Sequence, residues 1–105
     1  MKQILLDHCV PVPLRTMLSN CDVFSAGYLG WDELKNGKLL EAAEKAGFDI
    51  MITSDKNLRY QQNLTSRKIA IIELPTNLLR KMPLYVPEIQ IRISLIQPGA
   101  YEIIS

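Results

Sequence analysis

The sequence is poor in residues that build soft-metal and thiol chemistry, because it contains one histidine and two cysteines among 105 residues. Cys9 and Cys21 are not in a Cys-x-x-Cys spacing, and neither stands at a Cys/His spacing typical of zinc ligands. The pattern therefore argues against a zinc site or a dithiol redox centre. We expect both cysteines to be reduced thiols of a cytoplasmic protein.

Long apolar runs and an excess of one charge are also missing. No apolar stretch approaches the roughly 18 residues that a membrane span needs, and the short apolar run that ends at Asp7 is too short for a signal peptide. A formal net charge of +1 provides no overall electrostatic argument for nucleic acid binding. With 48% hydrophobic and 22% charged residues, the chain is expected to form a single globular domain over residues 1–105.

The distribution of apolar residues predicts strands that alternate with helices. Strands are expected over residues 3–6, 22–25, 50–53, 68–74 and 101–104. Helices are expected from residues 11–13 to 20, over 38–46 with Gly47 as the stop, near 58–64 and at 77–80. Residues 82–97 predict a last helix entered through Pro87, and a strand over 89–96 is the alternative. This order favours an α/β fold with a mostly parallel sheet and helices on both faces.

Two aspartates follow predicted buried strands. Asp7 comes directly after Ile4-Leu5-Leu6, and Asp55 comes two residues after the strand that ends at Thr53. The carboxyl ends of central parallel strands lie along one edge, so we expect these carboxylates to be neighbours. Oxygen ligands without His or Cys favour Mg²⁺ or Mn²⁺, which activates water for phosphoryl transfer. The simpler interpretation makes Asp7 a polar stop after a strand and Asp55 a helix N-cap.

Other acids are weaker candidates for this edge of the sheet. Asp49 starts its strand and is expected at the opposite edge, so we exclude it. Glu73 ends the fourth predicted strand, and strand order decides whether it reaches the site. Asp32 and Glu33 lie in the unusually long connection over residues 27–37, which could supply a missing charge.

Several motifs together resemble the PIN-like domains of small bacterial proteins, and more closely a compact subgroup of toxin–antitoxin type. The resemblance extends from Leu5 to about Leu74. Its motifs are Ile4-Leu5-Leu6-Asp7, Val10-Pro11, Gly30-Trp31, Leu34-Lys35-Asn36-Gly37, Leu39-Leu40, Gly47-Phe48-Asp49, Thr53-Ser54-Asp55, Asn57-Leu58 and Tyr60-Gln61-Gln62-Asn63-Leu64.

The resemblance implies a three-layer PIN-like fold with a sheet of four to five strands, and a Mg²⁺- or Mn²⁺-dependent endoribonuclease. Asp7 and Asp55 match catalytic, metal-binding acids of the family. Asn36 stands where relatives carry an acid, and His8 and Cys9 stand where relatives carry an acid or amide and then Asn. The implied partners are RNA and a small antitoxin protein, and both a monomer and a homodimer stay open.

Candidate RNA-binding residues are clustered in sequence around the predicted cleft. Cations and an aromatic ring suit phosphates and a stacked base of single-stranded RNA. These residues are Lys35, Lys56, Arg59 and Tyr60. The alternative is an ordinary solvated helix face. The side-chain amides of Asn57 and Asn63 are instead candidates, with Asp32 and Glu33, to make up for the missing acid at the metal site.

Three further residues have two interpretations each. Trp31 is expected to pin the 27–37 connection to the core rather than to stack a base. His8 could serve as a general acid or metal ligand, or as a hydrogen-bonded structural residue. Cys9 is taken as structural rather than as a nucleophile, because no base is recognisable beside it.

Two other functions compete with ribonuclease activity. The first is a PIN-like fold with weakened catalysis that binds RNA or protein. The second is a receiver-like or phosphatase-like domain in which Asp7 accepts a phosphoryl group and Thr53 and Lys56 contact phosphate.

Overall fold

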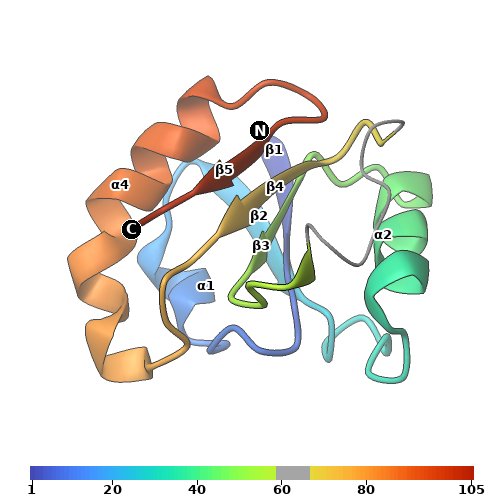
Figure 1. The fold of residues 1–105 in the computed structure, drawn as a ribbon, viewed down its shortest axis with the longest axis horizontal. Coiled ribbons are helices and arrows are strands. Elements are labelled where there is room, and N and C mark those ends of the chain that lie inside the picture. Colours follow the sequence, from blue (N-terminus) through green and yellow to red (C-terminus); the bar gives the residue numbers. More distant parts are fainter. Residues whose placement is uncertain (59–66) are drawn as a thin grey trace.

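An all-parallel β-sheet forms the centre of the protein (Figure 1). The computed structural model describes residues 1–58 and 67–105, and within these ranges the sheet has five strands in the order β2-β1-β3-β4-β5. The strands are β1 (Lys2–Leu6), β2 (Cys21–Ser25), β3 (Ile50–Thr53), β4 (Ala70–Glu73) and β5 (Tyr101–Ile103). All neighbouring strands pair in parallel, so the expected α/β class is confirmed.

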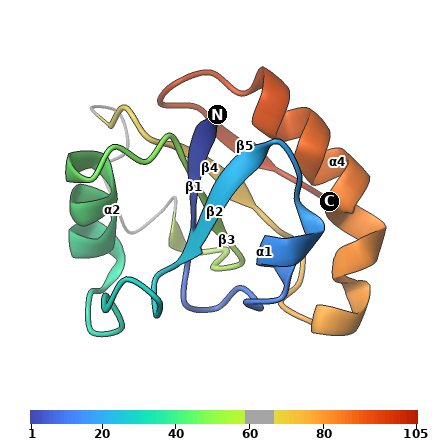
Figure 2. The ribbon, with the colours of Figure 1, turned by 180° about the vertical axis from the view of Figure 1, so that it is seen from behind.

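Helices cover both faces of this sheet (Figures 1 and 2). The helices are α1 (Leu14–Met17), α2 (Asn36–Lys45), the 3₁₀ turn η1 (Leu79–Lys81) and α4 (Met82–Leu95). Helix α2 lies on one face, and α1 and α4 lie on the other. No helix in the described ranges is long and apolar enough to cross a membrane.

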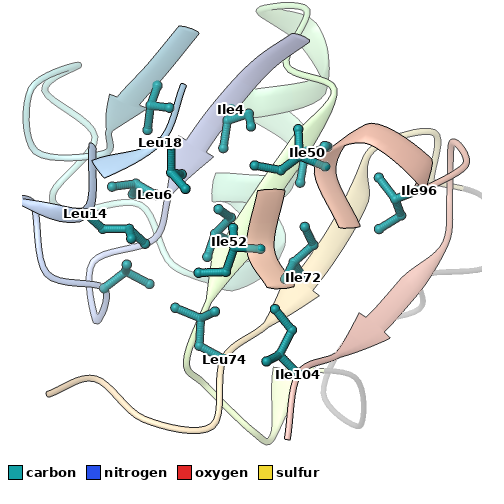
Figure 3. Close-up of a cluster of buried hydrophobic side chains, with 14 of the residues drawn as sticks. Ile4, Leu6, Leu14, Leu18, Ile50, Ile52, Ile72, Leu74, Ile96 and Ile104 are labelled. Atoms are coloured by element: carbon teal, nitrogen blue, oxygen red, sulfur yellow. The ribbon is translucent and has the colours of Figure 1, made fainter. Parts of the chain in front are cut away.

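The central strands are aliphatic because both of their faces are buried. Every residue of β3 (Ile-Met-Ile-Thr) and of β4 (Ala-Ile-Ile-Glu) is buried, as expected for parallel strands between two helical layers. Successive side chains alternate between the faces. Thus Ile52 and Ile72 pack on the α4 side with Ile4 (Figure 3), whereas Met51 packs on the α2 side.

Helix α2 matches its predicted bounds closely. Leu39, Leu40 and Ala43 are buried against the sheet, and Gly47 adopts a φ of 88° just beyond the helix. A residue with a side chain is disfavoured in this left-handed conformation, which is why glycine ends helices. The predicted stop at Gly47 is confirmed.

Helix α4 is confirmed as a helix, but its predicted entry through Pro87 is wrong. The helix begins at Met82, Pro83 lies in its first turn and Pro87 lies inside it. Proline is favoured in the first turn because the N–H groups there have no intrahelical partner. Ile89 and Ile93 are buried while Ile91 is exposed, which is helical spacing and excludes the strand alternative.

Two predicted elements are clearly shorter in the structure. The first helix ends at Met17, since Leu18 is already extended and Asn20 adopts a φ of 60°, a left-handed conformation that asparagine tolerates. The strand expected over 68–74 is confined to Ala70–Glu73. The helix expected near 58–64 falls almost entirely outside the described residues.

The strand order reverses direction between β1 and β3. From β1 the sheet grows through β2 on one side and through β3, β4 and β5 on the other. Open α/β sheets bind ligands outside the carboxyl ends of their strands at such a switch point. Asp7 follows β1 and Asp55 follows β3, so both predicted acids stand at this point.

Candidate functional site

Asp7 is buried at the switch point and is held by its neighbours. Only 6% of its surface is exposed, and its backbone N–H donates to the carbonyl of Ile52 at 2.9 Å. Its Oδ1 accepts the His8 backbone N–H at 2.7 Å, and its Oδ2 accepts the Thr53 hydroxyl at 2.8 Å. The carboxylate therefore also joins the ends of β1 and β3, as the simpler structural interpretation requires.

Thr53 connects the two predicted acids. Its Oγ1 donates to Asp7 and accepts the backbone N–H of Asp55 at 3.0 Å. Asp55 in turn accepts the Asn57 backbone N–H on Oδ1 at 2.9 Å, which is an Asx turn. One buried hydroxyl thus links the Asp7 carboxylate to the backbone of Asp55, and the Asp55 side chain caps the turn that follows β3.

Cys9 lies against the same group of atoms. Its Sγ accepts the Ser54 backbone N–H at 3.3 Å and lies 3.7 Å from Thr53 Oγ1 and 3.9 Å from Asp7 Oδ2. The thiol therefore bridges the loops after β1 and β3, which agrees with a structural role. Cys9 and Cys21 are both free thiols.

Glu73 extends this polar group to a third strand. The β3–β4 register places Thr53 beside Glu73. Leu5, Met51 and Ile71 point to the α2 side, so the residues two positions later, Asp7, Thr53 and Glu73, share that face. Glu73 is buried, and its Oε1 accepts the Tyr101 hydroxyl at 2.7 Å. Strand order therefore places Glu73 next to Thr53, at the end of β3.

The long connection after β2 is fastened to the site and to the core. His8 is exposed, and its Nε2 lies 3.1 Å from the Leu34 carbonyl oxygen, so it holds that connection against the loop after β1. Trp31 packs edge-on against Phe48 with ring centroids 6.1 Å apart. The prediction that Trp31 pins this connection to the core is confirmed.

The remaining candidates lie on neighbouring segments of the chain. Lys35 immediately precedes α2, Asn36 is the first residue of α2, and Lys56 and Asn57 follow Asp55 in the next turn. The exposed side chains are those of Asp32, Glu33, Lys35, Lys56 and Asn57. Arg59, Tyr60 and Asn63 lie outside the described residues.

A metal ion would find two carboxylates here rather than a complete cage. Among residues 1–58 and 67–105, no group of three or more His, Cys, Asp or Glu side chains is placed to hold a metal ion. An ionised carboxylate has about four acceptor positions, and Asp7 has three donors around it, from His8, Thr53 and Cys9. Mg²⁺ usually takes one or two carboxylates, several waters and substrate phosphates. Asp7 and Asp55 fit that modest requirement.

Sequence reasoning missed the part that Thr53 and Tyr101 take in this cluster. A threonine at the end of an otherwise aliphatic strand was the available signal for Thr53. Tyr101 offered no such signal, because its contact with Glu73 depends on β4 and β5 being neighbours.

A separate cavity lies at the opposite, N-terminal edge of the sheet. It has a volume of about 400 Å³, and its wall includes Lys2, Phe48, Asp49 and Lys68. Asp49 lies there as expected, and its Oδ2 accepts the Gln3 backbone N–H at 2.8 Å. This cavity is therefore distinct from the polar cluster at the carboxyl ends of the strands.

Comparisons with protein-family models, curated proteins and solved structures find no match to this chain. The resemblance to PIN-like domains thus stays a prediction from sequence motifs. The structure adds the arrangement of Asp7, Thr53, Asp55 and Glu73 at one edge of a parallel sheet.

Proposed function

We propose that the protein is a metal-dependent ribonuclease of PIN-like type that cleaves RNA internally. The observation that supports this proposal is the hydrogen-bond chain from Asp7 through Thr53 to Asp55 at the switch point between β1 and β3. Ligand sites of open α/β sheets lie at such points. An ion bound by both the Asp7 and the Asp55 carboxylates would offset the repulsion between the two negative charges.

In this proposal Asp7 and Asp55 hold Mg²⁺ or Mn²⁺, with the Asn36 amide as a further oxygen ligand. When bound, the ion supplies an activated water and compensates charge on the phosphate. Thr53 positions the Asp7 carboxylate, because its hydroxyl donates a hydrogen bond to Oδ2. Lys35 and Lys56 attract phosphates of the RNA, and Arg59 and Tyr60 complete the proposed RNA-binding set.

The proposal includes the cellular setting that the sequence motifs imply. The ribonuclease acts in the cytoplasm as the toxin of a toxin–antitoxin pair, and a small antitoxin protein blocks its RNA site. Co-expression with the protein encoded by a neighbouring reading frame tests this part. Relief of growth inhibition is expected, and an unchanged growth defect would contradict it.

Titration calorimetry with Mn²⁺ tests the metal site. Asp55→Asn keeps an oxygen that accepts the Asn57 N–H but removes the charge, so the fold is retained and Mn²⁺ affinity falls at least about tenfold. Asp49→Asn is the matched control, because Asp49 lies at the opposite edge of the sheet. Equal Mn²⁺ affinity of the Asp55→Asn variant and the wild type would refute the site.

The ribonuclease itself is tested with a labelled single-stranded RNA. The wild type is expected to cleave the RNA with Mn²⁺ and not with EDTA. The Asp55→Asn variant is expected to lose cleavage, and the Asp49→Asn variant is expected to keep it. Cleavage that persists in EDTA would refute a metal-dependent mechanism.

A second candidate is a PIN-like fold that binds RNA or protein without efficient catalysis. Its support is that Asp7 is surrounded by three protein donors and that the described residues form no three-ligand metal group. RNA binding that survives EDTA and Asp55→Asn, without cleavage, would select this function. A phosphoryl-accepting Asp7 is less consistent with the structure, because that carboxylate is buried and hydrogen-bonded on both oxygens.

A further inference from the structure

Helix α4 carries an apolar stripe on its outward face. Leu84, Ile91 and Leu95 are 74%, 51% and 67% exposed. Their spacing of seven and then four residues places them in one row along the helix. The buried residues Met82, Ile89 and Ile93 occupy the other side of α4. A helix that is apolar on two opposite sides is normally covered on both.

Two opposite charges run along one flank of this stripe. Glu88 is four residues from Leu84, and Arg92 follows it by one helical turn. Arg92 Nη2 lies 3.0 Å from Glu88 Oε1, and Arg92 Nη1 lies 2.8 Å from Glu102 Oε1 on β5. These hydrogen bonds, first to Glu102 and then to Glu88, raise the pKa of Arg92 above its ordinary value, so the guanidinium stays charged.

We propose that the outward face of α4 binds α4 of a second copy of this chain, with the two helices antiparallel about a two-fold axis. An axis midway between Leu84 and Leu95 places Leu84 opposite the partner's Leu95. Ile91 then meets the partner's Ile91 beside the axis. The apolar row is therefore complementary to itself, as a two-fold interface requires.

The charges select the antiparallel arrangement. A two-fold axis perpendicular to the helices brings each flank of α4 against the same flank of the partner, so Glu88 faces the partner's Arg92. A parallel pair, whose two-fold axis runs along the helices, would instead bring this flank against the opposite flank of the partner, which carries the uncharged Pro87 and Ser94. Only the antiparallel pair therefore sets opposite charges against each other across the interface, which favours that arrangement.

This interface and the candidate functional site occupy different faces of the sheet. Helix α4 packs on the side of Ile4 and Ile52, whereas Asp7, Thr53 and Glu73 point to the α2 side. Pairing through α4 therefore leaves the polar cluster uncovered. The proposal does not depend on the ribonuclease function.

Light scattering during size-exclusion chromatography over a concentration series tests the assembly. The wild type is expected to approach twice the chain mass of 11.9 kDa. The Ile91→Glu variant places a carboxylate beside its symmetry mate and is expected to show the single-chain mass with an unchanged circular dichroism spectrum. Tyr28→Glu is the matched control, because Tyr28 is 77% exposed and lies outside α4, and it keeps the doubled mass.

Disulfide trapping tests the direction of the helices. Positions 84 and 95 are about 16 Å apart along one helix, and a disulfide requires Cα atoms within about 7 Å, so the two positions cannot be bridged within one chain. A mixture of Leu84→Cys and Leu95→Cys proteins is expected to form crosslinked dimers between the two variants. Each variant alone, like the wild type with Cys9 and Cys21, is expected to show only background crosslinking.

Two results would overturn the proposal. A wild type that stays at the single-chain mass over the whole concentration series would exclude a second copy as the occupant of the stripe. Efficient crosslinking of Leu84→Cys protein with itself would indicate parallel helices and exclude the antiparallel pair.

Discussion

At the scale of single residues, the neighbours of Asp7 decide how its substitution should be interpreted. Asp7 accepts hydrogen bonds from Thr53 and from the His8 backbone, so it stabilises the ends of two strands besides any role in catalysis. Asp55 accepts the Asn57 N–H, a hydrogen bond that an asparagine can also accept. A loss of activity is therefore easier to interpret in the Asp55→Asn variant than in the Asp7→Asn variant.

We expect Asp7→Asn to lower the free energy of unfolding by about 1–3 kcal/mol, because one buried acceptor is replaced by an amide group that cannot accept. Asp55→Asn should lower it by less than Asp7→Asn does, because the asparagine oxygen can still accept the Asn57 N–H. Urea denaturation measures both values. Equal stability of Asp7→Asn and the wild type would show that the Thr53 and His8 contacts contribute little.

The thiol of Cys21 should make stability depend on pH in the alkaline range. Burial, and secondly the nearby Asp22 carboxylate, raise the pKa of Cys21 above its ordinary value. The folded protein therefore holds the thiol proton more tightly than the unfolded chain does. This advantage of the folded protein is fully present below the ordinary pKa and is lost as the pH rises through the raised pKa. The free energy of unfolding should therefore fall above about pH 8.5. Cys21→Ala should reduce this alkaline loss, and an identical pH profile in the variant would assign it to other groups.

At the scale of elements, two glycines in turns adopt a conformation that disfavours any residue with a side chain. Gly47 ends α2 with a φ of 88°, and Gly99 precedes β5 with a φ of 80°. A Cβ at Gly47 would meet no atom within 4 Å, whereas a Cβ at Gly99 would lie 2.9 Å from the Arg67 carbonyl oxygen. The Gly99 N–H also donates to the Lys68 carbonyl at 2.9 Å, which joins this turn to the start of β4.

Gly47→Ala should cost about 1 kcal/mol, from left-handed strain alone. Gly99→Ala should cost clearly more, because the added methyl group also displaces backbone. Thermal denaturation of both variants measures the difference. Gly47→Asn serves as a control that should recover part of the loss, since asparagine tolerates this conformation. A larger loss at Gly47 than at Gly99 would contradict the packing around the turn.

At the scale of the whole molecule, the sheet separates two apolar clusters. Ile72 belongs to the cluster beneath α4, and Leu40 belongs to the cluster between the sheet and α2. Both residues are fully buried. A 105-residue chain with one continuous sheet is expected to unfold in a single cooperative transition.

We expect Ile72→Val to cost about 0.5–1.5 kcal/mol and Leu40→Ala about 2–5 kcal/mol. Because the two side chains lie in separate clusters, the double variant should equal their sum within about 0.5 kcal/mol. Chemical denaturation followed by circular dichroism and by Trp31 fluorescence measures the three variants. Two separated transitions would show that the faces of the sheet unfold independently.

Much of the fold was predictable because its signals are local. The aliphatic runs that end at Leu6 and Thr53, the amphipathic pattern of α2 and its stop at Gly47 all follow from nearest neighbours along the chain. The predicted range of α4 began at Met82, but its first turn was wrongly assigned to Pro87, because both Pro83 and Pro87 suit a first helical turn. Only the packing of Met82 into the core distinguishes between the two prolines.

The sequence by itself determined that β1 and β3 each end near an aspartate and that Asp49 begins its strand at the other edge. Chain direction and side-chain alternation are local properties, so they can be inferred from the sequence alone. The tertiary structure alone decided that Glu73 stands beside Thr53, that Tyr101 reaches Glu73, and that one face of α4 stays outside the core. These contacts depend on which strands become neighbours and on how the helices pack, and residues far apart in the chain decide both.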